Sequence, residues 1–118
     1  MSFQTLNIEK RKKGVAWIKI LNEPVNAIDE RLMKELEEAA AQLEQDPSVR
    51  VIVLASNHPK IFLAGADLKS MIQNASDYAG EDGGIEKGSA RMQRCFHTFY
   101  SLPKPIIAAI NGHALGGG

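Results

Sequence analysis

Alternating apolar and polar residues at the start of the chain predict two antiparallel strands. The first run is "TLNIEKR" at residues 5–11, and the second is "GVAWIKI" at residues 14–20. A Lys-Gly pair separates them, as expected of a tight hairpin turn. Trp17 stands at an apolar strand position and is assigned to the core. The following stretch, "LNEPVNAID", is predicted to be a loop because of its Asn and Pro content.

A helical period follows from residue 30 to residue 45. Asp29 is a suitable N-cap, and Asp46-Pro47 ends the helix because proline cannot continue it. The apolar positions recur at intervals of four, four and three, which predicts one buried stripe. The residues of this stripe are Leu32, Leu36, Ala40 and Leu43.

The rest of the chain alternates strand and helix signals. "RVIVLAS" is almost wholly apolar, which is typical of a strand covered on both faces, and "IIAAIN" is interpreted in the same way. Residues 74–90 hold four glycines and many small polar residues, and they predict a surface excursion. A helix is expected at about residues 86–101. The order of elements predicts an α/β fold.

Two turns of small residues stand out after apolar strands. They are "LAGAD" at residues 63–67 and "HALGGG" at residues 113–118. A helix leaves its first backbone N–H groups unpartnered, so a strand–turn–helix start can present donors to an anionic oxygen. Two such turns side by side would form an oxyanion hole. The alternative is purely structural, since glycine turns after strands are common. Neither turn fits a dinucleotide or phosphate-loop motif.

Composition narrows the class of protein. Lys plus Arg and Asp plus Glu each number 14, so the net charge is zero and no nucleic-acid partner is expected. The basic run at residues 10–13 is assigned to a hairpin turn.

No apolar run reaches the roughly 20 residues of a membrane helix, so no membrane partner is expected. The three histidines show no metal spacing, so no metal is expected. The single cysteine, Cys95, allows no internal disulfide, and a cytoplasmic location is expected, with a processed mitochondrial matrix protein as the alternative.

Three motifs together carry a family resemblance. "PVNAID", "IFLAGADLKSM" and "KPIIAAINGHALGGG" closely resemble the enoyl-CoA hydratase/isomerase, or crotonase, family in order and spacing. The resemblance implies a crotonase-like spiral of ββα units. It makes residues 1–118 the first half of a single domain, apparently truncated after the GGG turn, and this half alone is expected to be poorly stable and inactive. It also implies a homotrimer or dimer of trimers that needs no cofactor, acyl-CoA being the substrate.

The same resemblance assigns the site residues. The main-chain N–H groups of Ala66 and Gly117 are the implied catalytic donors to the thioester oxygen. The positions implied to embrace CoA are Val25, Ala27, Ala64, Asp67, Leu68 and Lys69. Asp67 is interpreted first as a helix cap, and Lys69 as either a phosphate contact or a solvent-facing residue. Glu23 departs from the family, where many members carry a basic residue at this position.

The type of reaction depends on residues that the family places after Gly118. Its hydratases use two glutamates, the first two positions past the triple glycine and the second about twenty further on. Glu81, Asp82 and Glu86 belong to the polar excursion and are interpreted as solvated. Reversible hydration of 2-enoyl-CoA, as in fatty-acid β-oxidation, is the commonest activity of the family, so it is the activity that the resemblance favours. Double-bond isomerisation and a non-catalytic acyl-CoA-binding or oligomer-forming role are the alternatives.

Overall fold

A twisted hairpin starts the fold, as the alternating pattern predicts. In the computed structural model, which describes residues 2–66 and 84–118, β1 (Leu6–Arg11) pairs antiparallel with β2 (Val15–Ile20). A short 3-10 turn, Lys12–Gly14, joins them. β4 (Val51–Ser56) and β7 (Ile106–Ala109) extend the sheet in parallel, in the order β1-β2-β4-β7.

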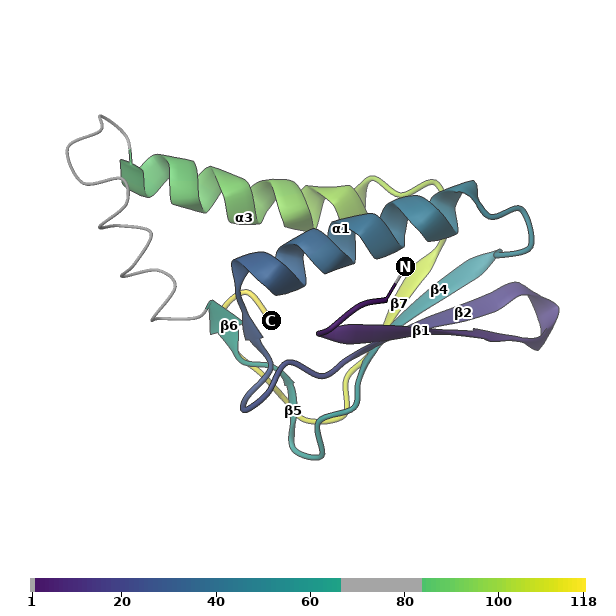
Figure 1. Ribbon diagram of the computed structural model, residues 1–118, viewed down its shortest axis with the longest axis horizontal. Helices are drawn as coiled ribbons and strands as arrows, with labels where there is room; N and C mark the ends of the chain where they lie inside the picture. Colours follow the sequence, from purple (N-terminus) through teal and green to yellow (C-terminus); the bar gives the residue numbers. More distant parts are fainter. Residues whose placement is uncertain (1, 67–83) are drawn as a thin grey trace.

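Two helices lie side by side over one face of this sheet (Figure 1). α1 (Glu30–Gln45) begins at Asp29, whose carboxylate accepts the Leu32 N–H at 2.8 Å, so the predicted N-cap is confirmed. Its predicted stripe is also confirmed, because all four residues are buried together with Met33 and Ala39. They pack on β1, β2 and β4, and the fully buried side chains there include Ile18, Ile20 and Ile52.

The second helix, α3 (Gly84–Tyr100), is tied to α1 by charge as well as packing. Arg91 contacts the carboxylates of Glu30 and Glu37, at 3.1 and 2.6 Å. This helix starts two residues before the predicted position, inside the stretch assigned to the polar excursion. The remainder of that excursion lies outside the described residues. No helix within the described ranges is long and apolar enough to cross a membrane.

Lys104 binds the C-terminal end of α1. Its Nζ donates to the main-chain oxygens of Leu43 and Asp46, at 2.6 and 2.7 Å. These carbonyls lie at the negative end of the helix, where a cation is favourable. The turn after α3 is thereby held against the end of α1, which positions β7 beside β4.

Two burial predictions are wrong, each for its own geometric reason. Trp17 is only partly buried, with the Arg11 guanidinium 4.2 Å above its ring, because strand alternation turns Ala16, Ile18 and Ile20 inward instead. β7 was expected to be buried on both faces, yet Ile107 is 56% exposed. Within the described residues β7 pairs only with β4, so it is an edge strand there.

Four short strands gather at the end of the molecule away from the β1–β2 turn (Figure 1). β3 (Ala27–Ile28) pairs in parallel with β6 (Gly65–Ala66), and β5 (Ile61–Leu63) pairs in parallel with β8 (His113–Ala114). Neither pair was predicted, because the first was assigned to a loop and a turn. These two small ladders bring the three motif segments together.

Candidate functional site

The two small-residue turns meet in space. At the end of the parallel β5–β8 ladder, the Leu115 N–H donates to the Leu63 oxygen at 3.0 Å. At the other end of the same ladder, the His113 N–H donates to the Lys60 oxygen at 3.1 Å. The turn at residues 64–66 and the turn at residues 115–118 therefore leave neighbouring strands at the same edge.

Glycine is required where these turns touch. Gly65 has a φ of +91°, and a Cβ on it would lie 2.8 Å from the Leu115 oxygen. A Cβ on Gly118 would lie 2.5 Å from the Leu63 oxygen. Positive φ and backbone approaches this close both exclude larger residues. Contact between two main chains thus explains the glycines at these two positions.

Ile28 lies between the two predicted donors. It pairs in register with Ala66 across β3 and β6. Its Cδ1 would lie 3.6 Å from a Cβ on Gly117, and the Phe96 ring from α3 would lie 2.9 Å from the same Cβ. Ala66 and Gly117 consequently border one apolar spot made by Ile28 and Phe96. A Cβ on Gly117 would require the Phe96 ring to shift.

Three of the residues predicted to bind CoA lie on the two segments that pair next to Ile28 and Ala66. Ala27 pairs with Gly65, and the Ala64 N–H donates to the Asn26 oxygen at 3.1 Å. Val25 is 41% exposed at the tip of its loop. Asp67, Leu68 and Lys69 lie outside the described residues. The motif segments around residues 25 and 65 are thus brought together by direct main-chain contact.

A buried asparagine that the sequence reasoning missed joins these segments. Asn26 is fully buried and has a φ of +56°, a conformation that asparagine tolerates. Its Oδ1 accepts the Asn22 N–H at 2.7 Å, and its Nδ2 donates to Ser56 Oγ at 2.8 Å and to the Phe62 oxygen at 3.1 Å. The signal in the sequence is its position. Asn26 stands between apolar residues in "PVNAI", which is unusual for an asparagine of an exposed loop.

No described side chain offers a conspicuous nucleophile or metal site. Cys95 is buried with its Sγ 3.8 Å from the Met33 oxygen, and burial raises the pKa of its thiol to about 11, so it is protonated near neutral pH. Among the side chains that the structure describes, no three of His, Cys, Asp or Glu gather to hold a metal ion.

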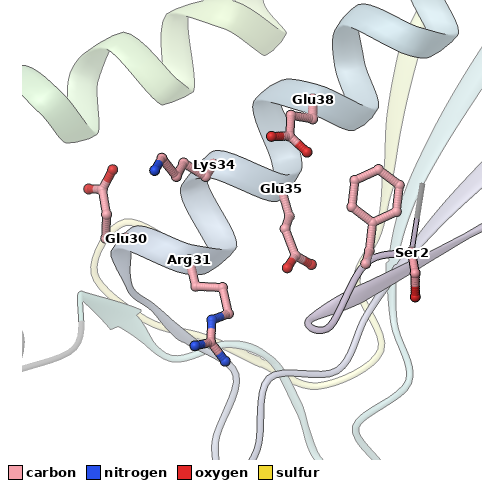
Figure 2. Close-up of a pocket in the computed structure, with 7 residues that line it drawn as sticks. Ser2, Glu30, Arg31, Lys34, Glu35 and Glu38 are labelled. Carbon is pink, nitrogen blue, oxygen red and sulfur yellow. The ribbon is translucent and has the colours of Figure 1, made fainter.

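A separate hollow of about 370 Å³ lies between α1 and the N-terminal segment (Figure 2). Charged side chains of α1 surround it, with Ser2 on its other side. Glu35 is already occupied there, since its Oε1 accepts the N–H groups of Gln4 and Thr5 and the Thr5 hydroxyl. None of the predicted site residues that the structure describes lines this hollow. It lies where the N-terminal segment packs against α1.

The amino-acid sequence is similar to those of a known family and of several known proteins. The family described as enoyl-CoA hydratase/isomerase matches residues 10–118. A probable enoyl-CoA hydratase of Bacillus subtilis is 42% identical over 106 residues, which are 88% of this chain and 38% of that protein. A crotonyl-CoA hydratase of Syntrophomonas wolfei is 32% identical over 120 residues, covering 100% of this chain and 43% of that protein.

Solved structures show the same likeness in three dimensions. The crystal structure of an enoyl-CoA hydratase from Bacillus anthracis superposes with a TM-score of 0.81 at 31% identity, over 98% of this chain and 43% of that one. The chain thus spans less than half the length of the relatives that it matches.

Proposed function

Because the chain belongs to the enoyl-CoA hydratase/isomerase family, we propose that the protein carrying it catalyses the reversible hydration of 2-enoyl-CoA thioesters. The resemblance carried by the three motifs is confirmed, and the fold is that of part of a crotonase-like domain. Both relatives described above are named as hydratases, which favours hydration among the reactions of the family.

One observation supports the proposed mechanism above the others, namely the contact between the two small-residue turns. The Leu115–Leu63 hydrogen bond and the tight approach at Gly65 hold the backbones around Ala66 and Gly117 against each other. In the proposal, the main-chain N–H groups of Ala66 and Gly117 both donate to the thioester carbonyl oxygen. Small residues are then needed because the substrate must reach the main chain itself.

The proposed chemistry follows from where charge develops. A water oxygen adds to C3 of the enoyl group, the electron pair of the double bond moves toward the thioester, and the carbonyl oxygen becomes enolate-like. A proton then adds to C2, which gives the 3-hydroxyacyl thioester. Two fixed donors stabilise the enolate-like oxygen more than the neutral carbonyl, and this difference lowers the barrier. The acid and base for water and proton transfer are assigned by family resemblance to glutamates at positions after Gly118.

The CoA portion is proposed to lie along the loop at residues 22–28 and the stretch at residues 64–69. Val25, Ala27 and Ala64 would contact it from these segments, and the family resemblance adds Asp67, Leu68 and Lys69 to the proposed contacts. The exposed Val25 tip is accessible to a ligand, while Ala27 and Ala64 are held by pairing with the neighbouring backbone. Lys69 is proposed as the phosphate contact in this group.

Double-bond isomerisation is the second candidate, because the matching family is described by both activities. Isomerisation needs the same enolate-stabilising donors but moves a proton between C2 and C4 without adding water. Where the encoded chain continues past Gly118, a glutamate two residues further favours hydration. Another residue type at that position favours isomerisation.

The direct test measures the loss of crotonyl-CoA absorbance with the encoded full-length protein. Ala66→Pro removes the proposed N–H donor and is expected to lower kcat about 100- to 1,000-fold. Ala66→Ser keeps the main-chain N–H and is the matched control, expected to retain activity within a few-fold.

The outcomes separate the candidates. Thermal unfolding of both variants shows whether each remains folded. A folded Ala66→Pro protein with undiminished kcat would falsify the donor assignment. A parent protein that shifts the double bond of a 3-enoyl-CoA but leaves crotonyl-CoA unhydrated supports the isomerase instead. A parent that acts on neither thioester contradicts both.

A further inference from the structure

The His58 ring uses both of its nitrogens in the turn between β4 and β5. Its Nδ1 lies 3.1 Å from the main-chain N atoms of Lys60 and Ile61, and its Nε2 lies 2.9 Å from the Pro24 oxygen. A main-chain N–H can only donate, so Nδ1 accepts and carries no proton. In the neutral ring the proton is then on Nε2, which donates to the Pro24 carbonyl.

The two nitrogens therefore have different partners. Nδ1 closes the local turn that leads into β5, and β5 leads into the Ala64–Ala66 stretch. Nε2 reaches across to a second segment, the loop that carries Val25 and Ala27. One side chain thus connects two of the segments that the proposed function assigns to the CoA portion of the substrate.

The loop depends on this contact at its tip. Asn26 anchors the inner end of the loop, since its amide is buried against Ser56 and Phe62. Glu23, Pro24 and Val25 are exposed. Among the described residues, the hydrogen bond from His58 Nε2 to the Pro24 oxygen is the one that joins a side chain of another segment to this exposed tip. No other hydrogen bond or ion pair between described residues ties Glu23, Pro24 or Val25 to a segment outside this loop.

The same turn also holds the third motif. Asn111 Nδ2 donates to the His58 main-chain oxygen at 3.1 Å, and the His113 N–H donates to the Lys60 oxygen at 3.1 Å. Asn111 and His113 begin the segment that ends in the glycines. The turn at residues 56–61 is consequently the place where all three motif segments are attached.

We propose that His58 is a positioning residue that holds the Pro24–Val25 tip in the place where it contacts the CoA portion of the thioester. This inference rests on the proposed function. The ring does not touch the reacting atoms in this arrangement, since it acts through the loop backbone. Its loss is expected to weaken substrate binding and to leave the chemical step intact, so KM rises while kcat is kept.

Two amide substitutions separate the two nitrogens. The oxygen of asparagine falls near the position of Nδ1, so His58→Asn keeps the local turn but is too short to reach Pro24. The amide nitrogen of glutamine falls near the position of Nε2, so His58→Gln keeps the donor to Pro24. The matched control is His97→Asn, which changes an exposed histidine on α3.

The assay uses crotonyl-CoA and the encoded full-length protein. His58→Asn is expected to raise KM about 5- to 20-fold, which is the effect of losing one neutral hydrogen bond, with kcat within about twofold of the parent. His58→Gln is expected to restore KM to within about threefold. His97→Asn is expected to leave both constants unchanged. A merely structural role for His58 would instead lower the melting temperature without a selective change in KM.

A second measurement tests the tether without relying on activity. The Asn26 N–H donates to the Asn22 oxygen across the loop at 2.7 Å, and its amide hydrogen exchange is expected to be faster in His58→Asn than in the parent and to return toward the parent in His58→Gln. Unchanged exchange at Asn26 overturns the tether itself. Faster exchange with an unchanged KM overturns the role in substrate binding while leaving hydration standing. A parent that neither binds nor hydrates crotonyl-CoA overturns the proposed function, and the CoA part of this proposal with it.

Discussion

Gly65 and Leu115 lie far apart in the sequence and meet so closely that a Cβ on Gly65 would stand 2.8 Å from the Leu115 oxygen. The contact lies between the two turns that carry Ala66 and Gly117. Leu115 in turn donates its N–H to Leu63, just before Gly65. The geometry of one turn is therefore fixed by the main chain of the other, and a change in either should be felt in both.

Gly65→Ala should destabilise the protein and impair its activity. The φ of +91° is unfavourable for alanine, and the new methyl group would displace the Leu115 carbonyl. We expect the free energy of unfolding to fall by about 2–4 kcal/mol and crotonyl-CoA hydration to fall at least about 100-fold, as for a lost oxyanion donor. Urea unfolding and the absorbance assay measure the two effects.

The control for this substitution is Gly14→Ala in the β1–β2 turn. Gly14 also has a positive φ, +79°, but its Cβ would meet the flexible Arg50 side chain. A smaller destabilisation of about 1 kcal/mol with unchanged activity is expected. Equal loss of activity in both variants would show that the effect of Gly65→Ala is general unfolding.

Asn26→Ala should be strongly destabilising although it changes a single loop residue. The substitution leaves the Asn22 N–H and the Phe62 carbonyl without their amide partner in a buried place. A loss of about 2–4 kcal/mol is expected in urea unfolding. Asn57→Ala, at an exposed position in the turn between β4 and β5, should change stability by less than about 0.5 kcal/mol.

Asn26→Asp separates shape from hydrogen bonding. Aspartate is nearly isosteric, but it replaces the donor Nδ2 with an oxygen that faces the Phe62 carbonyl. It should therefore destabilise about as much as alanine. An aspartate variant as stable as the parent would contradict the assigned orientation of the amide.

Lys104→Met should weaken the end of α1. Methionine keeps most of the apolar stem of lysine but loses the two hydrogen bonds to the Leu43 and Asp46 oxygens and the charge at the helix C-terminus. The expected loss is about 1–2 kcal/mol in urea unfolding. Lys12→Met, at an exposed turn position, should have little effect, and comparable losses in both variants would argue against the helix-end role.

The Cys95 thiol should make stability fall at alkaline pH. Burial, with the Glu37 carboxylate as the second cause, raises its pKa from an ordinary 9.0 to about 11. Between these values the unfolded chain loses the thiol proton while the folded protein keeps it. The unfolded state then binds fewer protons, so the free energy of unfolding falls as pH rises from about 9 to about 11.

The comparison with Cys95→Ala isolates this contribution. The alanine variant is less stable overall because of the cavity it creates. Its stability should nevertheless decline less steeply between pH 9 and 11 than that of the parent. Parallel declines would show that Cys95 does not carry the effect. Labelling of the native protein by a thiol reagent at pH 8 should also be slow until the protein unfolds.

Local elements were predictable from the sequence because their signals are local. The spacing of Leu32, Leu36 and Leu43 and the N-cap at Asp29 define α1 without reference to the rest of the fold. The strands at residues 6–20 and 51–56 follow from alternation and from a continuous apolar run. The error at Trp17 is also local. Both faces of β2 carry apolar residues, so the sequence pattern does not show whether Trp17 or its neighbours Ala16 and Ile18 face the core.

The helices, the long strands and the family could be read from the amino-acid sequence, because periodicity, capping residues and the three motifs are all local features of the chain. The pairing of β3 with β6, the full burial of Asn26 and the contact of His58 with Pro24 became known from the folded structure alone. Each of these depends on contact between segments that are distant in the chain. A two-residue strand or a buried amide has no period of its own, and its stability comes from partners that only folding brings within hydrogen-bonding distance.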